Sequence, residues 1–318
     1  MIVEKPTRDG FGEGLLELGE TNKDVVVLTA DLSASVRAQW FMDKYPLRSF
    51  KLGVAEQDMI GTAAGLSLGG KIPFAGTFGV FASGRAWDQL RVSVCYMNLN
   101  VNIAASHGGI SVGEDGATHQ ALEDITLMRA LPNMTVVVPC DALEAKKATI
   151  ASASYPGPVY LRLGKQKVPF MTSPEAIFNI GKADILRTGK DITIFACGLM
   201  VAEALKAGEL LTKKGIDARI INMHTISPID IQAIIDAAQE TRAIVTIEEH
   251  SLTGGLGSAV AEVVVERCPV PMKMIGIRSQ FGQSGKPLVL LKEYGLTAED
   301  IKNTIIGFLE TVKPNYSL

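Results

Sequence analysis

The sequence predicts an α/β protein in which a larger parallel-sheet domain is followed by a smaller α/β domain. Short β-branched runs alternate with helical patterns of ten or more residues, which is the order of β-α-β units. The runs are almost wholly apolar, as strands are when helices cover both faces of a parallel sheet. The alternation stops over residues 164–190, where prolines and scattered charges indicate a linker. We therefore predict a first domain over 1–165, a linker over 166–190 and a second domain over 191–318.

The first domain is expected to begin with a helix and then a strand at 24–30. Its helices are expected over 8–20, from Glu56, over 82–97, over 120–130 and after Asp141. Asp141 is a plausible N-cap because its short carboxylate can accept a backbone N–H of the first turn. Further strands are expected in the runs IPFAGTF, LNVNIAAS, MTVVVP and GPVYLRL.

The linker contains Pro169 and Pro174 and could include a short hairpin. The alternation resumes at DITIFACG and continues through DARIINMHTI, AIVTIEE and VPMKMIGI, with helical patterns between these runs. This second α/β domain is expected to be the smaller of the two.

Composition limits the classes of function. The chain of 34.0 kDa has 47% hydrophobic residues, enough for a large core. Its net charge is −3 with both signs mixed, whereas a nucleic-acid partner would require a basic patch. Four well-separated cysteines without a C-x-x-C pair suggest reduced, buried thiols. No signal core and no apolar run of about 20 residues is evident, so we expect a cytoplasmic protein without membrane contact.

Glu56 stands out in the stretch LGVAEQDMIGTAAGLSLGG, at the start of a predicted helix. The residues that follow are apolar on nearly every face, so this helix is predicted to be buried and closely packed through its glycines. Burial raises the pKa of a carboxyl group in general, and such an acid can share a proton with a ligand nitrogen. The alternative is a carboxylate that satisfies backbone N–H groups at the helix N-terminus.

Phe78 and Phe81 follow the end of a predicted strand, where ligands of open α/β sheets bind. They could stack on a flat heterocycle, or they could simply belong to the core, as phenylalanines three residues apart on a helix often do.

The loop SHGGISVGEDGATHQALED contains two of the four histidines, His107 and His119, together with Glu114 and Asp115. Long glycine-rich loops in compact domains are usually functional. A metal site is the rival interpretation, but the spacing of these groups does not resemble a zinc pattern and no thiol is near. The third interpretation is a solvated turn.

Possible ligands for an anion are scattered along the chain: Arg8, Ser35, Arg162 and Lys165. Neither G-x-G-x-x-G nor G-x-x-x-x-G-K-[ST] occurs, so the sequence has no fingerprint for a nucleotide phosphate. The glycine-rich TGGLGSA at 253–259 is interpreted as a tight junction between a strand and a helix.

Taken together, these segments resemble the C-terminal half of transketolase over nearly the whole chain. The resemblance is most specific in four segments that follow one another in the family's order: GVAEQDM, PFAGTFGVFASGRAWDQLR, HGGISVGEDGATHQALEDITLMRALPNM and VPCDALEA. It implies a pyrimidine-binding domain of thiamine-diphosphate enzymes followed by the transketolase C-terminal domain. The family's GDG motif for the diphosphate and metal is absent from this chain. The resemblance therefore implies one subunit of a split transketolase, with an N-terminal partner subunit that binds the diphosphate and Mg²⁺ or Ca²⁺.

The resemblance also implies roles for individual residues. Glu56 would hydrogen-bond a ring nitrogen of the cofactor's aminopyrimidine, and His119 would contact the reacting hydroxyls of the sugar, so both would be catalytic. The other cofactor-binding residues would be Phe78, Phe81 and, with a weaker match, Asp31. The sugar would be bound by Asp115 at a hydroxyl and by four residues at its phosphate end: Arg8, Ser35, His107 and Lys165. No metal ligand is expected in this chain, and the assembly would be a dimer of heterodimers.

Two departures from the family pattern concern the site. Gly84 replaces an aromatic residue that fused transketolases usually have after the phenylalanine pair, and Lys165 stands where arginine is usual. Three other interpretations remain open. The β subunit of a 2-oxoacid dehydrogenase shares the domain pair but lacks the GEDGATHQ loop. Deoxyxylulose-phosphate synthase usually lacks the histidine corresponding to His107, and a non-catalytic binding subunit would not require Glu56 or His119.

Overall fold

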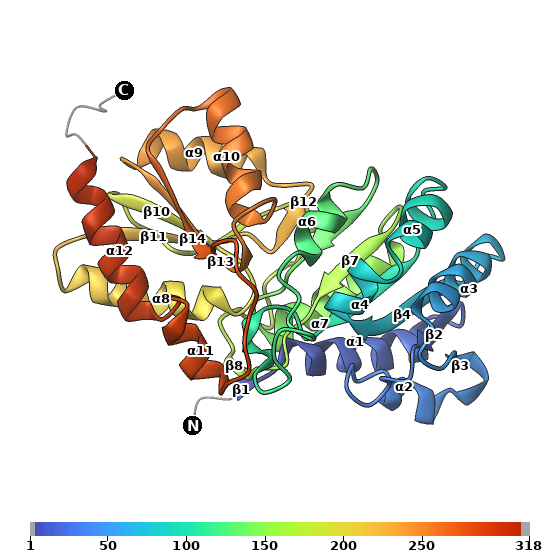
Figure 1. The fold of residues 1–318 in the computed structure, drawn as a ribbon. Coiled ribbons are helices and arrows are strands. Elements are labelled where there is room, and N and C mark those ends of the chain that lie inside the picture. The colour runs from blue at the N-terminus through green and yellow to red at the C-terminus, as the bar shows by residue number, and fades with distance from the viewer. Residues whose placement is uncertain (1–3, 313–318) are drawn as a thin grey trace.

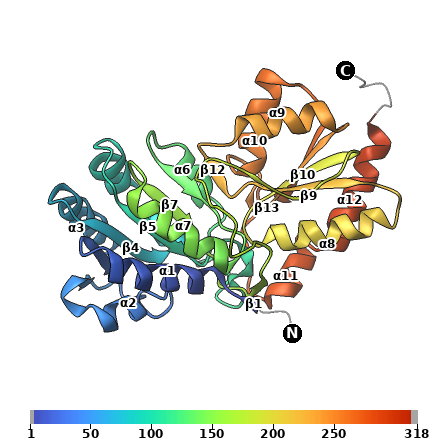
Figure 2. The same cartoon turned by 180° about the vertical axis from the view of Figure 1, so that it is seen from behind.

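The computed structural model describes residues 4–312, so the first three residues of the predicted first domain and the last six of the second lie outside it. The described chain forms two α/β units side by side, one around each of two sheets, as Figure 1 and the reverse view in Figure 2 show. The predicted fold class is confirmed.

The first unit is built on a seven-stranded sheet with the order β12-β6-β7-β5-β4-β2-β3. Except for the β12–β6 pair, neighbouring strands run parallel. β2, β5 and β7 are buried along their whole length, as expected for strands covered on both faces. Its strands are β2 (Val25–Thr29), β3 (Ser49–Lys51), β4 (Ile72–Phe78), β5 (Asn102–Ser106), β6 (Thr135–Val137), β7 (Val159–Arg162) and β12 (Thr225–Ser227).

Two groups of helices cover this sheet. On one face, Val25 and Val27 pack with residues of α1 and α7. On the other face, Val26 and Leu28 belong to a layer with residues of α3, α4, α5, α6 and the π-helix that follows α5. The helices are α1 (Thr7–Thr21), α2 (Gln39–Lys44), α3 (Glu56–Leu68), α4 (Gly79–Gly84), α5 (Trp87–Gln89), the π-helix Leu90–Cys95, α6 (Asp124–Arg129) and α7 (Ala142–Ser154), with short 3₁₀ turns at Pro46–Arg48 and Ile110–Val112. Asp141 accepts from the Glu144 N–H, so the predicted N-cap of α7 is confirmed.

The helix predicted over 82–97 is instead three short pieces. The chain leaves helical geometry at Ala86 (φ −107°, ψ 16°), between α4 and α5, and then continues as the π-helix. The Trp87 indole donates to Leu127 O at 3.1 Å, which holds the second piece against α6. The helix predicted over 120–130 begins only at Asp124, because the preceding residues extend the loop that carries His119.

The prediction that α3 is buried on all sides and packed through its glycines is wrong. Met59, Ile60 and Ala63 are buried, but a Cβ at Gly61 or Gly65 would contact nothing within 4 Å. The glycines thus mark an open face of the helix in this chain.

The second unit has a five-stranded sheet with the order β14-β13-β10-β11-β9, parallel except for the β11–β9 pair. Its strands are β9 (Asp184–Arg187), β10 (Ile192–Ala196), β11 (Ala218–Asn222), β13 (Ile244–Ser251) and β14 (Met272–Ile277). Its helices are α8 (Met200–Thr212), α9 (Ile231–Glu240), α10 (Leu256–Arg267), α11 (Pro287–Glu293) and α12 (Ala298–Thr311).

The segment predicted as a linker takes part in two pairings. β9, near its end, belongs to the second sheet. β8 (Val168–Pro169) pairs with β1 (Glu4–Lys5) at the start of the chain, so the short hairpin considered for the linker does not form. β12, from the second unit, pairs with β6 of the first sheet. A strand from beyond the linker thus completes one edge of the first sheet, and a strand from the linker completes one edge of the second.

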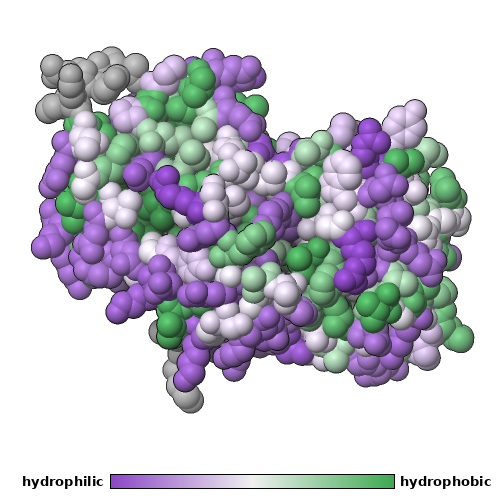
Figure 3. Space-filling model, in the orientation of Figure 1, coloured by the Kyte–Doolittle hydropathy of each residue, from purple (hydrophilic) through white to green (hydrophobic). Residues whose placement is uncertain are grey.

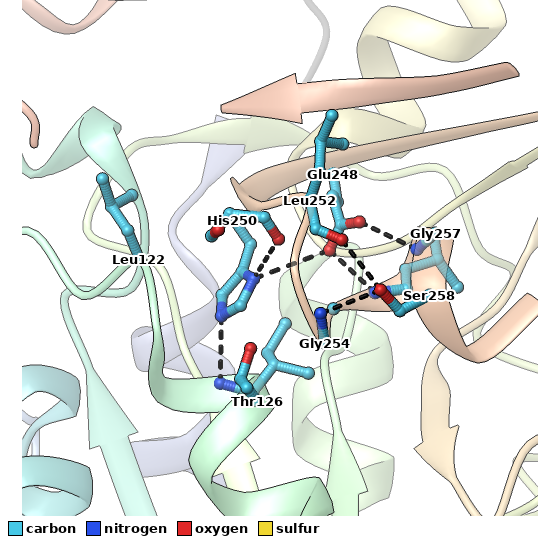
Figure 4. A network of polar contacts seen from close by, with 12 residues as sticks. Leu122, Thr126, Glu248, His250, Leu252, Gly254, Gly257 and Ser258 are labelled. Carbon is cyan, nitrogen blue, oxygen red and sulfur yellow. Dashed lines mark hydrogen bonds and ion pairs between the residues drawn. The ribbon is translucent and has the colours of Figure 1, made fainter. Parts of the chain in front are cut away.

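A buried polar network also joins the units (Figure 4). His250 of β13 accepts from the Ile125 N–H of α6 at 3.2 Å. Beside it, Glu248 accepts from the N–H groups of Leu256 and Gly257 at the start of α10, at 2.7 and 2.8 Å. Because these groups are buried, their hydrogen bonds fix one relative placement of β13, α6 and α10.

Three cysteines are buried as predicted, but Cys268 is only partly buried, so that prediction fails for it. All four thiols are free. Within residues 4–312, no helix is long and apolar enough to cross a membrane. On the face drawn in Figure 3, hydrophilic and hydrophobic side chains are interspersed.

Candidate active site

Glu56 is a buried carboxylate with two side-chain partners. It opens α3 and is 1% exposed. One carboxylate oxygen accepts from Thr77 Oγ1 at 3.1 Å, and the other accepts from Arg85 Nη1 at 2.7 Å. Among the described residues it accepts no backbone N–H, so the interpretation of Glu56 as a helix-terminal cap is wrong. Its carboxylate is held between the end of β4, through Thr77, and the C-terminal end of α4, through Arg85.

Arg85 is a site residue that the sequence analysis missed. Its guanidinium carbon lies 4.5 Å from the centroid of the Phe81 ring while the same group donates to Glu56. Phe81 and Arg85 are four residues apart, and i,i+4 side chains lie on one face of a helix. That spacing was a usable signal, because a cation within about 6 Å of an aromatic face is attracted to it.

Phe78 and Phe81 form an aromatic group with the two histidines of the glycine-rich loop. The rings of Phe78 and Phe81 are stacked, with centroids 6.0 Å apart and planes inclined by 18°. Phe78 lies 3.9 Å from the ring of His107, and Phe81 lies 5.5 Å from that of His119. Phe78 is buried and belongs to the core, whereas Phe81 is only partly buried.

The glycine-rich loop is held by the second unit. Gln120 donates to Gln283 O at 2.9 Å, and the Ser111 N–H donates to the carboxylate of Glu249. Gly109 has φ +82°, and a Cβ there would collide with Glu249. Glycine is therefore required where the loop comes this close to Glu249. The close contact helps to fix the position of the loop, which carries His107 and His119.

Lys165 and Asp115 form an ion pair at 3.1 Å at the edge of the same region. The Lys165 ammonium also donates to Val112 O at 3.1 Å. The hydrogen bond that Lys165 donates to the Asp115 carboxylate lowers the pKa of Asp115. Both side chains are partly exposed, so they remain accessible to a ligand.

His107 is 3% exposed, and burial, with the neighbouring Arg8 and Lys165 cations, lowers its pKa to about 3. Its Nδ1 lies 2.9 Å from Ser106 Oγ. His107 is therefore neutral near pH 7 and offers a polar ring rather than a charge. The cations near it are Arg8 and Lys165.

Arg8 reaches the loop after β2, where its Nη1 donates to Ser35 O at 2.9 Å. Its Nε is buried without a partner among the described residues. Ser35 thus contacts Arg8 through its backbone carbonyl and not through its hydroxyl. Asp31 follows β2 with φ +59° and makes no described side-chain contact with the other site residues.

Arg162 is not available to a ligand, so its interpretation as an anion ligand is wrong. The side chain is 7% exposed, and Nε donates to Asp124 while Nη2 donates to the carbonyls of Ala121 and Glu249. Its donors are used inside the protein, where they join β7 to α6 and to the second unit.

The described residues contain one set of three side chains spaced for a metal ion: Glu144, Asp184 and His224, with ligand atoms within 4.8 Å of one another. The Glu144 carboxylate already accepts from the Cys140 N–H at 2.6 Å and from Asn222 Nδ2 at 2.7 Å. Burial raises the pKa of Glu144 to about 8. The residues of the glycine-rich loop do not form such a set.

The region around Glu56 is suited to an aminopyrimidine. A planar guanidinium lies over the Phe81 face while one of its N–H groups points to a buried carboxylate. An aminopyrimidine has the same features, a flat π-system with N–H groups or protonated nitrogens in its plane. In this structure the planar guanidinium of Arg85 contacts both Glu56 and Phe81.

Comparison with known proteins gives the family. Residues 4–171 match the family model of the transketolase pyrimidine-binding domain, and residues 181–301 match that of the transketolase C-terminal domain. The chain belongs to the transketolase family. The resemblance inferred from the sequence is confirmed.

Three similar proteins show which part of a transketolase the chain represents. A putative transketolase C-terminal section of Methanocaldococcus jannaschii is 49% identical and covers 96% of both chains. A 6-deoxy-6-sulfo-D-fructose transketolase subunit of Clostridium sp. (strain MSTE9) is 44% identical over 94% of this chain and 93% of its own length. A solved structure described as a split gene transketolase, inactive β4 tetramer, has a TM-score of 0.91 at 48% identity and covers 97% of this chain and 99% of its own. The chain thus corresponds over nearly its full length to separate C-terminal transketolase chains.

Proposed function

We propose that the chain is the C-terminal subunit of a two-subunit transketolase, which transfers a two-carbon ketol unit from a ketose to an aldose with thiamine diphosphate. The observation that carries the proposal is the buried Glu56 carboxylate, which shares a planar donor, the Arg85 guanidinium, with the face of Phe81. A regulatory or purely structural subunit would not need a buried carboxylate beside an aromatic face.

Glu56, Phe78 and Phe81 would hold the aminopyrimidine end of the cofactor. Thiamine diphosphate, when bound, supplies the carbanion chemistry of ketol transfer. Glu56 then holds a proton at the ring nitrogen of the pyrimidine, and Phe81 fixes the plane of the ring. Thr77, which donates to the other oxygen of Glu56, orients the carboxylate. Asp31 is a weaker candidate because no described contact places it with this group.

His119 and Asp115 would bind the sugar. His119 lies edge-on to Phe81 and Phe78, so it borders the place that the ring would take. A histidine there can donate or accept a hydrogen bond at a reacting hydroxyl. Asp115 can accept from a hydroxyl further along the chain of the sugar.

Arg8 and Lys165 would bind a terminal anion of the sugar, with His107 and Ser35 beside them. Both cations lie close enough to His107 to lower its pKa. Two cations and a neutral imidazole suit a phosphate or a sulfonate. One relative is described as acting on 6-deoxy-6-sulfo-D-fructose, and another is named as an apulose-4-phosphate transketolase subunit. We propose a ketose with such a terminal group, of which phosphate is the first candidate.

The diphosphate and its Mg²⁺ or Ca²⁺ would be bound by an N-terminal partner subunit, because this sequence has no GDG motif. We propose a dimer of heterodimers in the cytoplasm, without nucleic-acid or membrane partners. The open face of α3 at Gly61 and Gly65, next to the exposed Leu68, is available for one of the contacts.

Reconstitution tests the proposal. The purified chain is mixed with its N-terminal partner subunit, thiamine diphosphate and Mg²⁺, and ketol transfer is measured with a ketose phosphate donor. We expect activity only in the complete mixture. Activity of this chain alone would refute the dependence on a partner, and an inactive complete mixture that still binds the cofactor would refute the reaction.

A further inference from the structure

Arg85 uses both of the groups that would recognise the cofactor's pyrimidine. Its Nη1 donates to one carboxylate oxygen of Glu56 at 2.7 Å, and its guanidinium lies 4.5 Å from the centroid of the Phe81 ring. The other carboxylate oxygen of Glu56 accepts from Thr77. A second planar donor could therefore reach this carboxylate over the same ring only if Arg85 moved.

The backbone holds Arg85 at this position. Gln57, the neighbour of Glu56 on α3, donates from Nε2 to Arg85 O at 3.2 Å. Arg85 follows the last residue of α4, and the chain turns out of helical geometry at Ala86. The side chain therefore starts next to α3 and reaches back along α4 to Phe81.

Gly84 leaves space beside this contact. A Cβ at Gly84 would contact nothing within 4 Å. No side chain from this position shields the contact, and the Arg85 side chain is 45% exposed. Water competes for the exposed guanidinium, whereas the Glu56 side chain is 1% exposed and keeps only Thr77 as a side-chain donor when Arg85 leaves. Arg85 can thus leave Glu56 when another planar donor takes its place.

We propose that Arg85 competes with the aminopyrimidine of thiamine diphosphate for the Glu56 carboxylate and the face of Phe81, and thereby limits how readily the chain takes up the cofactor. The inference rests on the proposed function. The competition follows from geometry, because the guanidinium and the ring are both flat, both donate to the carboxylate in their plane and both cover the same aromatic face. The fraction of molecules with Glu56 free then sets the apparent affinity.

The test is calorimetric titration of thiamine diphosphate into this chain assembled with its N-terminal partner and Mg²⁺. Arg85→Met keeps a long apolar stem but cannot donate to Glu56. We expect its dissociation constant to be about 3- to 10-fold lower than that of the unaltered chain, through faster association with unchanged dissociation. Arg267→Met is the matched control, since it removes one exposed positive charge from the surface of the second unit and should leave the constant unchanged.

Unchanged or weaker binding by Arg85→Met, in a variant whose thermal unfolding matches the unaltered chain, overturns the proposal and would make Arg85 a bystander or a cofactor ligand. If Arg85→Met does not fold, Arg85→Lys replaces it, because lysine keeps the charge but lacks the planar fork. That variant must also bind more tightly. If neither the unaltered chain nor any variant binds thiamine diphosphate, the proposed function fails together with this inference. Tight binding without a difference between them refutes the role of Arg85 alone.

Discussion

Arg162 donates to both carboxylate oxygens of Asp124, at 3.1 and 2.9 Å, and the two side chains are 7% and 0% exposed. The pair joins the end of β7 to the first residue of α6, directly after the loop that carries His119. Tyr160 also donates to Asp124 at 2.9 Å. The Asp124 carboxylate therefore accepts from two buried side chains, and removal of Arg162 leaves this buried carboxylate without its cation.

Arg162→Met is expected to lower the free energy of unfolding by about 3–5 kcal/mol, because it leaves the buried Asp124 charge unpaired. Urea unfolding followed by circular dichroism measures this change. Lys71→Met is the control, since it breaks an exposed ion pair with Asp24 and should cost no more than about 1 kcal/mol. Equal losses in the two variants would contradict a structural role for the Arg162–Asp124 pair.

Glu56→Gln is expected to retain thiamine diphosphate in the assembled enzyme but to lower kcat by about 10²- to 10⁴-fold, the usual effect of losing a positioned acid–base group. Glutamine keeps the shape but cannot hold a proton at the ring nitrogen in the same way. Hydrogen–deuterium exchange at the thiazolium carbon, followed by NMR, measures the step directly. Asp58→Asn alters the other acid of the first turn of α3 and should leave the exchange rate unchanged. Rapid exchange in Glu56→Gln would show that Glu56 only orders the site.

Much of this arrangement could be read from the sequence, because it depends on local patterns. The apolar runs that became β2, β5 and β7 are long enough to identify, and Asp141 is followed by a typical first turn. The glycine-rich loop indicated a site because its residues fit no regular element. Those features are encoded within a dozen residues of the chain.

Long-range contacts could not be read in this way. Arg162 was interpreted as an anion ligand because nothing in GPVYLRL reveals the Asp124 carboxylate 38 residues earlier. Arg85 was missed because its partner Glu56 lies 29 residues away, on another helix. The glycines of α3 indicated close packing, yet their face is open in this chain. A glycine in the sequence is compatible with close packing, but it does not reveal whether another residue packs against that position.

His224→Gln is expected to weaken the dependence of stability on pH in acid. Burial lowers the pKa of His224 to about 4, from an ordinary value of 6.5. The unfolded chain therefore takes up a proton first as the pH falls, and the stability from this group is present above pH 6.5 and lost as the pH falls toward 4. Glutamine does not titrate, so the slope of unfolding free energy against pH should differ between the two proteins by up to about 1.4 kcal/mol per pH unit in this window.

Urea unfolding at a series of pH values from 4.5 to 7.5 measures this difference. Burial raises the pKa of Glu248 to about 7, which acts in the opposite direction because the folded state then holds the proton. That contribution is common to both proteins and cancels in the comparison. Parallel curves would mean that folded His224 is protonated as easily as in the unfolded chain.

Lys165→Met tests whether the site binds a terminal anion. Lys165 is one of two cations near the buried, neutral His107, and its other contacts are to Asp115 and to Val112 O. Because the Asp115 side chain is 44% exposed, the loss of its partner should cost little stability. A charged hydrogen bond to a phosphate contributes about 1.5–3 kcal/mol. That phosphate is held alike in the ground and transition states, so its loss should raise KM rather than lower kcat.

For a phosphorylated ketose we therefore expect Lys165→Met to raise KM by about 10- to 100-fold with kcat little changed. For the same ketose without its phosphate, KM should be unaffected, because no anion is left to bind. Lys167→Met, two residues further on and exposed, is the matched control for charge and should behave as the unaltered enzyme. His119→Gln should instead lower kcat with both sugars, because we propose that His119 contacts the reacting hydroxyls. An equal loss with both sugars in Lys165→Met would show that the lysine acts on the sugar or the loop, and the assignment of a terminal anion to this site would have to be withdrawn.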